Sequence, residues 1–337
     1  MSGASGSSSP ACRAPVAGDR AARWIALAER VALVVALLAT VAVFGALLPN
    51  VFLTWANLTT ILGSQAVLVV VTLGLLCPLI AGDFDLSVAQ VLTLSSMAIA
   101  VLNVGMGWPI WAAVLAALAI GLLVGFANGF FVVVFNIHSL IVTLGIGTIL
   151  HGITLWISGS RTISGVSFGL VDLVIVGRLF GIPYAFYYAM GICFLMWYGL
   201  RYTAVGRRLL FVGRGREVAR LSGISVGRMR WGALVLSSLL GAVAGVMYTG
   251  TTGAADPTSG LSLLLPAFAA AFLGATSIEP GRFNPWGATL AVYFLVTGIT
   301  GLTMLGIQTY VQELFYGGAL IVAVVLSQLV RGRREMM

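Results

Sequence analysis

Acidic residues inside the apolar part of this chain are few, and two of them stand close together. Asp83 and Asp85 are the only acids between Glu29 and Asp172. Ionisable groups near hydrocarbon are costly to bury and often mark the route of a transported solute. Two interpretations remain open for this pair. The carboxylates break one helix and cap the next with help from Ser87, which we favour, or they contact a solute directly.

Other reactive residue types are scarce. All 18 basic residues are arginine. The absence of lysine excludes an ordinary P-loop ATPase, whose loop needs lysine to reach the phosphates, and it excludes Schiff-base catalysis. Neither the two histidines, His138 and His151, nor the three cysteines have the spacing of a metal site. We therefore predict no catalytic residue, no metal and no cofactor in this chain, and no Ser/His/Asp constellation supports an intramembrane enzyme.

Polar amides and small residues lie within the apolar runs. Asn103, Asn128 and Asn136 are interpreted as donors of hydrogen bonds between helices, with lining of a solute route as the alternative. Small residues recur every fourth position and predict close helix approach. These residues are Gly121, Gly125 and Gly129 in one run, and Gly241 and Gly245 in another.

The composition places these residues in a membrane. The 337 residues are 60% hydrophobic and 8% charged, with a mean hydropathy of +1.06. In lipid every backbone polar group needs an internal partner, and the runs are apolar on all sides, so helices are favoured over barrel strands. We predict an all-α polytopic protein with about ten transmembrane helices. The expected spans are 31–48, 61–81, 86–104, 109–134, 139–158, 183–200, 231–252, 261–276, 285–304 and 309–330.

Arginine placement orients these spans. Arginines cluster before residue 31, within 201–230 and after residue 330. The positive-inside rule places all three clusters in the cytoplasm, which requires an even number of spans on each side of 201–230. The expected spans meet that condition. We predict a disordered cytoplasmic tail over 1–30, a permease domain over 31–330, a cytoplasmic tail over 331–337 and an inner (plasma) membrane location. The same count of spans places the segment 82–86 on the cytoplasmic side of the membrane. The alternative is that this segment is a helix break within the membrane.

The long polar segment 201–230 is the most informative stretch. Residues 217–222 favour a helix, and Gly223 follows as a terminator. Val218 and Leu221 are three residues apart and share one face. From charge alone, a docking helix and a basic loop on anionic lipid are equally favoured. If the helix docks, changing Val218 and Leu221 should matter more than changing Arg214 and Arg216.

The same segment resembles the cytoplasmic coupling segment of ABC importer permeases, closest to the ribose/simple-sugar branch, which is related to branched-chain amino-acid permeases. The residues that carry this resemblance are Gly206, Arg207, Arg208, Glu217, Val218, Ala219, Leu221, Gly223 and Ile224. The resemblance implies that these residues couple the chain to an ATPase. The family's common Gly-Gly-Asn is replaced here by the Gly-Arg-Gly-Arg of 213–216.

Further segments resemble the same family in the same order. They include the Gly-Asp-Phe-Asp-Leu-Ser-Val of 82–88, the Asn-Gly of 128–129, the stretch 135–145, the Ile-Ser-Gly of 163–165 and the Gly-Leu-Thr-Met-Leu-Gly of 301–306. We expect six polar residues of these segments to line the translocation path or to lie at a helix break. They are Asp83, Asp85, Ser87, Asn128, Asn136 and Thr143. The segment 261–281 lacks the Glu and Asp common in sugar permeases, so the resemblance leaves the solute open.

The resemblance implies a permease subunit of an ATP-driven importer for a small polar solute, with a sugar favoured. The implied partners are a separate ABC ATPase that binds ATP and Mg²⁺, a secreted or periplasmic solute-binding protein, a second permease copy and membrane lipid, but no nucleic acid. The alternative is an ion-coupled secondary transporter. Such proteins commonly use paired intramembrane acids or cations, and this chain has few candidates.

Overall fold

The computed structural model describes residues 17–308 and 310–335 and is almost wholly helical. The long helices are α1 (Ala17–Leu47), α3 (Ala66–Ile80), α4 (Val88–Ala100), α5 (Ile110–Gly129), α6 (Ser139–Ser158), α8 (Tyr184–Tyr202), α11 (Val226–Thr252), α12 (Ser259–Gly274), α13 (Pro285–Met304) and α14 (Tyr310–Glu335). Short helices are α2 (Trp55–Ser64), α7 (Phe168–Val171), α9 (Ala204–Arg214) and α10 (Arg216–Leu221). The predicted all-α class is confirmed.

Each expected span has a helix. Eight of the described segments are long and apolar enough to cross a membrane. These eight run from Arg30–Leu47, Trp55–Ile80, Val88–Gly105, Ile110–Val134, Ser139–Ser158, Val226–Thr252, Pro285–Met304 and Tyr310–Gln328. The remaining two expected spans, 183–200 and 261–276, are present as α8 and the shorter apolar α12. One difference lies at the start, where α1 begins at Ala17 and so extends into the range expected to be a tail; residues 1–16 and 336–337 lie outside the described residues.

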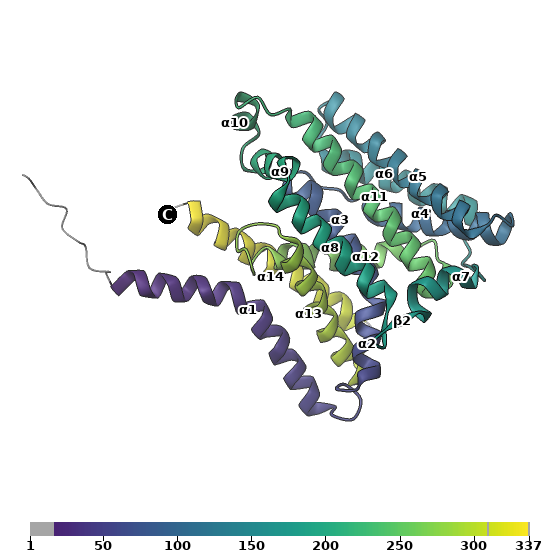
Figure 1. Ribbon diagram of the computed structural model, residues 1–337, viewed down its shortest axis with the longest axis horizontal. Helices are drawn as coiled ribbons and strands as arrows, with labels where there is room; N and C mark the ends of the chain where they lie inside the picture. The colour runs from purple at the N-terminus through teal and green to yellow at the C-terminus, as the bar shows by residue number, and fades with distance from the viewer. Residues whose placement is uncertain (1–16, 309, 336–337) are drawn as a thin grey trace, which may run out of the picture.

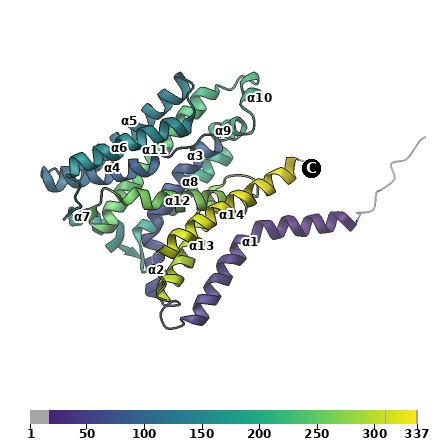
Figure 2. The ribbon, with the colours of Figure 1, turned by 180° about the vertical axis from the view of Figure 1, so that it is seen from behind.

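Helices α3 and α4 form the centre of the bundle. Every residue of both helices is buried, as expected for α3, which is apolar on almost all sides. Figures 1 and 2 show α5, α6 and α11 on one side of the bundle and α1, α13 and α14 on the other. Helix α11 contacts α3, α4 and α5, so it joins the central pair to α5.

The predicted small-residue ladders lie where helices approach most closely. A Cβ built on Gly241 of α11 would sit 2.9 Å from the carbonyl oxygen of Val88 in α4. A Cβ on Gly125 of α5 would sit 2.6 Å from the Cα of Val235 in α11. Both distances are too short for a side chain, so the packing interpretation of these glycines is confirmed.

Four two-residue strands form two small antiparallel pairs. Strand β1 (Ile163–Ser164) pairs with β4 (Ala254–Ala255), and β2 (Arg178–Leu179) pairs with β3 (Ile182–Pro183). These pairs follow α6 and α11 and precede α8 and α12, so they lie at one end of the bundle. The opposite end carries α9, α10 and the start of α11 (Figure 1). We call this opposite end the arginine-rich end.

Candidate coupling and solute-path sites

The first candidate site is the break between α3 and α4. Helix α3 ends at Ile80, and Gly82 follows two residues later at a left-handed φ of +77°. The amide of Asp83 donates to the carbonyl of Pro78 at 2.9 Å, and the amide of Gly82 donates to that of Leu79 at 3.1 Å. This is the Schellman arrangement, which glycine favours because it lacks a Cβ. The turn sends the chain across the arginine-rich end before α4 begins at Val88.

Asp83 is buried and is held by two arginines. Nε and Nη2 of Arg230 donate to the two carboxylate oxygens at 2.7 and 2.9 Å. Nη2 of Arg216 donates to Oδ1 at 3.0 Å. The Asp83 side chain is 3% exposed and that of Arg230 is 10% exposed, so both charges of this two-bond ion pair are removed from water. Loss of Asp83 would therefore leave the charge of Arg230 buried without a partner.

Asp85 has a different role in the same turn. Its Oδ1 accepts from the amide of Ser87 at 2.9 Å and from the hydroxyl of Ser87 at 2.6 Å. Nδ2 of Asn128 in α5 donates to the same Ser87 hydroxyl at 2.8 Å. The expectation that Ser87 caps α4 with its side chain is therefore wrong, because Ser87 makes no side-chain cap bond and its amide is instead satisfied by Asp85.

Helix α6 holds the turn from the other side. The hydroxyl of Ser139 accepts from the amide of Phe84 at 3.0 Å, and the hydroxyl of Thr143 accepts from the amide of Leu86 at 3.1 Å. These bonds satisfy backbone groups that the helix break leaves free. Asp85, Ser87, Asn128 and Thr143 are thus brought together. Asn136 is not, because it is exposed in the turn before α6 at a φ of +52°.

The second candidate site is the segment between α8 and α11. Helix α9 begins with the hydroxyl of Thr203 accepting from the amide of Gly206 at 3.1 Å. A Cβ on Gly206 would overlap the carbonyl oxygen of Gly199 in α8, so glycine permits this sharp corner. An open groove of about 370 Å³ follows, lined by Ala204, Arg207, Arg208, Phe211 and Ile224.

Helix α10 is the expected short helix. The amide of Ile224 donates to the carbonyl of Ala219 at 3.0 Å, and Gly223 has a φ of +78°, as in other glycine-terminated helices. Ala219 is buried, whereas Val218 is 59% exposed and Leu221 is 84% exposed. Glu217 pairs with Arg220 at 2.8 Å, with both side chains largely exposed, so this pair contributes little to stability.

Sequence reasoning missed the arginine partners of Asp83. Arg216 and Arg230 were counted as topology signals, and Arg216 was grouped with Arg214 as less important. The structure separates them: Arg216 bonds Asp83, whereas Arg214 has no hydrogen bond or ion pair with the side chains that the structure describes. The count of spans places the segments 82–86 and 201–230 on the same side of the membrane. This shared side is the sequence signal that could have paired Asp83 with the two arginines.

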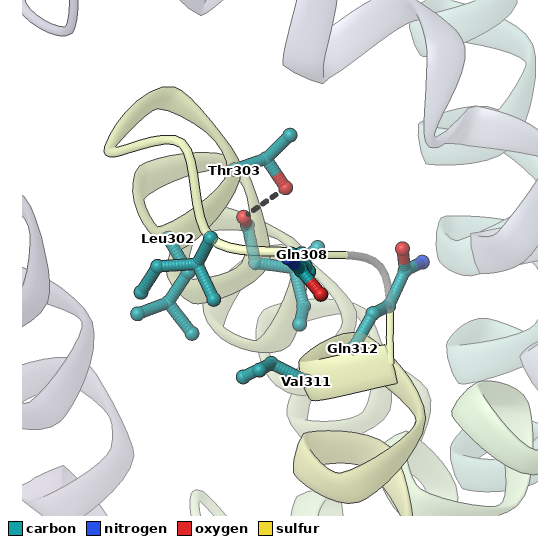
Figure 3. A pocket seen from close by; sticks show the side chains of 7 residues that line it. Leu302, Thr303, Gln308, Val311 and Gln312 are labelled. Carbon is teal, nitrogen blue, oxygen red and sulfur yellow. Dashed lines mark hydrogen bonds between the residues drawn. The ribbon is translucent and has the colours of Figure 1, made fainter.

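The end of the bundle opposite the arginine-rich end carries a hydrogen-bonded acid and a small pocket. The carboxylate of Asp256 accepts from the hydroxyl of Thr162 at 2.8 Å and from that of Thr258 at 2.6 Å. The Thr258 bond is the largest cause that lowers the pKa of Asp256 below its usual value. Figure 3 shows a pocket between α13 and α14 that is lined by residues including Thr303, Gln308 and Gln312. Its volume is about 50 Å³. That volume admits a few water molecules and lies well below the roughly 300 Å³ at which ligand sites begin.

Comparisons with known proteins show the family of this chain. The family model described as branched-chain amino acid transport system / permease component matches residues 57–324. The D-allose transport system permease protein AlsC of Escherichia coli (strain K12) is 32% identical over 83% of this chain and 85% of its own length.

Two further relatives cover a similar share. The ribose import permease protein RbsC of Escherichia coli (strain K12) is 32% identical over 82% of this chain and 87% of its own length. The xylose transport system permease protein XylH of the same strain is 24% identical over 84% of this chain and 87% of its own length. No solved structure matches. The chain therefore belongs to the permease-component family of ABC import systems, and it is a multi-pass membrane transport subunit rather than an enzyme.

Proposed function

We propose that this chain forms the membrane path of an ATP-driven importer of a monosaccharide, an aldopentose or aldohexose. The names of three relatives refer to allose, ribose and xylose, and these sugars share a compact ring that carries several hydroxyl groups. Polar side chains within the spans, such as Asn128 and Thr143, are candidates to lie near the solute path. Family membership favours this function over ion-coupled secondary transport.

The observation that carries the proposal is the exposed apolar face of α10. Val218 and Leu221 point away from the bundle, while Ala219 between them is buried against it. Covering exposed apolar side chains with a partner removes them from water, which is favourable. A short helix with such a face fits a groove in a partner protein. We assign that groove to a separate ABC ATPase, which binds ATP and Mg²⁺, so this chain needs no cofactor.

The proposed orientation places the arginine-rich end in the cytoplasm. The carbonyl of Arg30 accepts from the amide of Ile278 and the hydroxyl of Ser277, so the start of the first span lies beside the loop before α13. Arg201 lies 3.9 Å from Glu279 in that same loop. Arginines near span ends favour the cytoplasmic side. Both termini are then cytoplasmic, in an inner (plasma) membrane.

The remaining partners follow from the same orientation. The segment 159–183 and strand β4 face outward, where a secreted or periplasmic solute-binding protein would deliver the sugar. We propose that a second permease copy, identical or similar, completes the path, and that lipid covers the other apolar faces. Nucleic acid has no role in this proposal, and the arginines serve membrane orientation and coupling.

The test is a double substitution on α10. Val218→Asp with Leu221→Asp should leave the chain inserted but should abolish co-purification of the ATPase and ATP-dependent uptake. The complete transporter, tagged on this chain, is reconstituted in liposomes and assayed with radiolabelled D-ribose, D-allose and D-xylose. Arg214→Gln is the matched control in the same segment and should behave as the unmodified chain. Full ATPase binding by the double variant, or uptake driven by an ion gradient without ATP, would reject the proposal.

A further inference from the structure

The carboxylate of Asp83 joins three parts of the chain that are remote in sequence. It belongs to the turn after α3, Arg216 begins α10 and Arg230 lies in the first turns of α11. We infer that Arg216 is a positioning residue that fastens the coupling helix α10 to the central helices α3 and α4. This inference rests on the proposed docking of the ATPase at α10.

The Arg216 side chain donates hydrogen bonds to more than one group of the α3–α4 turn. Its Nη2 donates to the carbonyls of Ala81 and Gly82 at 3.3 and 2.8 Å, in addition to Oδ1 of Asp83. These carbonyls close the C-terminal end of α3, where a positive charge is favourable. One guanidinium therefore holds both the backbone and the side chain of the α3–α4 turn.

A second contact, nearby, joins the preceding helix α9 to α3. The backbone of Gly213, at the end of α9, lies so close to α3 that a Cβ there would overlap the carbonyl oxygen of Ile80. Between these contacts the chain passes through Gly215 in a fully extended conformation at a φ of −176°. The backbone link from α9 to α10 is thus a single extended residue, and the Arg216 side chain supplies a second attachment.

This attachment has a mechanical consequence. Helices α3 and α4 are wholly buried, so a movement of the ATPase cannot reach them directly. Packed elements transmit force when they are held together and otherwise move independently. With Arg216 in place, displacement of α10 moves the α3–α4 turn. Without it, the same displacement is absorbed at Gly215 and by α11.

The charge balance makes Arg216 the informative position. The Arg216 side chain is 42% exposed, whereas those of Asp83 and Arg230 are almost wholly buried. Arg216→Gln leaves the buried Asp83–Arg230 pair neutral and intact, so the variant should fold. Substituting Asp83 would instead leave the buried charge of Arg230 unpaired. Nearby Arg214 is exposed and offers a control of equal charge change.

The experiment compares Arg216→Gln, Arg216→Lys and Arg214→Gln in the complete reconstituted transporter. The probes are ATP hydrolysis and uptake of whichever of D-ribose, D-allose and D-xylose the unmodified transporter carries. Arg216→Gln should keep the ATPase bound and active, while sugar taken up per ATP hydrolysed falls about five-fold or more. Arg216→Lys, which keeps the charge, should recover part of that ratio. Arg214→Gln should leave the ratio unchanged.

The outcomes separate this inference from the docking proposal. If Arg216→Gln keeps the unmodified ratio of uptake to hydrolysis, the inference is wrong although docking stands. If it loses the ATPase altogether, Arg216 acts in docking and not in fastening, which also overturns the inference. If Arg214→Gln lowers the ratio equally, general charge explains the effect. Retention of the ATPase by the Val218/Leu221 double variant would instead reject the docking site.

Discussion

The Nδ2 of Asn128 donates to the hydroxyl of Ser87 across 2.8 Å, and this bond ties α5 to the start of α4 in the buried centre. Ser87 passes the interaction on to Asp85. Four elements, α3, α4, α5 and α6, therefore meet at one turn. These bonds hold the turn in place, although Oδ2 of Asp85 and Oδ1 of Asn128 have no hydrogen-bond partner among the residues that the structure describes.

Asn128→Ala should lower stability by about 0.6–1.7 kcal/mol, the range for hydrogen bonds between membrane helices. The substitution removes the donor to Ser87 and leaves a small void. Thr148→Ala is the control, because Thr148 is exposed and bonds only its own helix. Unfolding in mixed detergent micelles measures both variants, and equal stability of the two would contradict a structural role for the Asn128–Ser87 bond.

Asp83→Asn should lower the free energy of unfolding by about 3–5 kcal/mol, more than Asn128→Ala does, because Arg230 then stays buried without a counter-charge. The measurement is the folded, inserted yield together with the unfolding midpoint in detergent. Asp83→Leu with Arg230→Met removes both charges and should recover much of the lost stability. No recovery in the double variant would mean that the pair is not the cause of the loss.

Close packing between α11 and α4 gives a steric prediction. Gly241→Ala places a methyl group 2.9 Å from the carbonyl oxygen of Val88 and should cost about 1–3 kcal/mol. Gly152→Ala in α6 meets open space and should be neutral or stabilising by about 0.5–1 kcal/mol. Thermal unfolding of the two variants provides the comparison, and a harmless Gly241→Ala would show that the helices can separate freely.

The strand pair β1–β4 should loosen in acid. Hydrogen bonds from Thr258 and Thr162 lower the pKa of Asp256 below 3.8. A carboxyl with a lowered folded-state pKa stabilises the fold above its unfolded pKa, and this stabilisation is lost as pH falls through the lower value. Amide exchange of 162–166, corrected for intrinsic rates, should therefore rise in strong acid. Asp256→Asn should exchange faster at neutral pH and show no such acid transition.

Topology can be tested with single cysteines in a chain without its own three cysteines. Gly215→Cys, whose extended backbone suits any residue, should react with an impermeant maleimide only from the cytoplasmic side. Gly169→Cys in α7 at the outer end should react only from outside. Labelling of position 215 in intact cells would reverse the proposed orientation.

Part of this protein was determined by the sequence alone. The helical class and the positions of the spans follow from hydropathy, which is a local property of each run. Helix α10 and its terminator were also predictable, since Gly223 and the neighbouring residues carry the signal within a few positions. The shared side for 82–86 and 201–230 followed from counting spans between arginine clusters.

Tertiary structure decided what these segments do to each other. Asp83 is separated by 133 residues from Arg216 and by 147 from Arg230, and no local pattern links residues so far apart. Val218 and Leu221 point outward because Ala219 packs against the bundle. Asn136 is exposed because it lies in the turn before α6. A carboxylate beside arginines becomes a fixed joint only when packing removes water from around it, and that requires the whole bundle to be assembled.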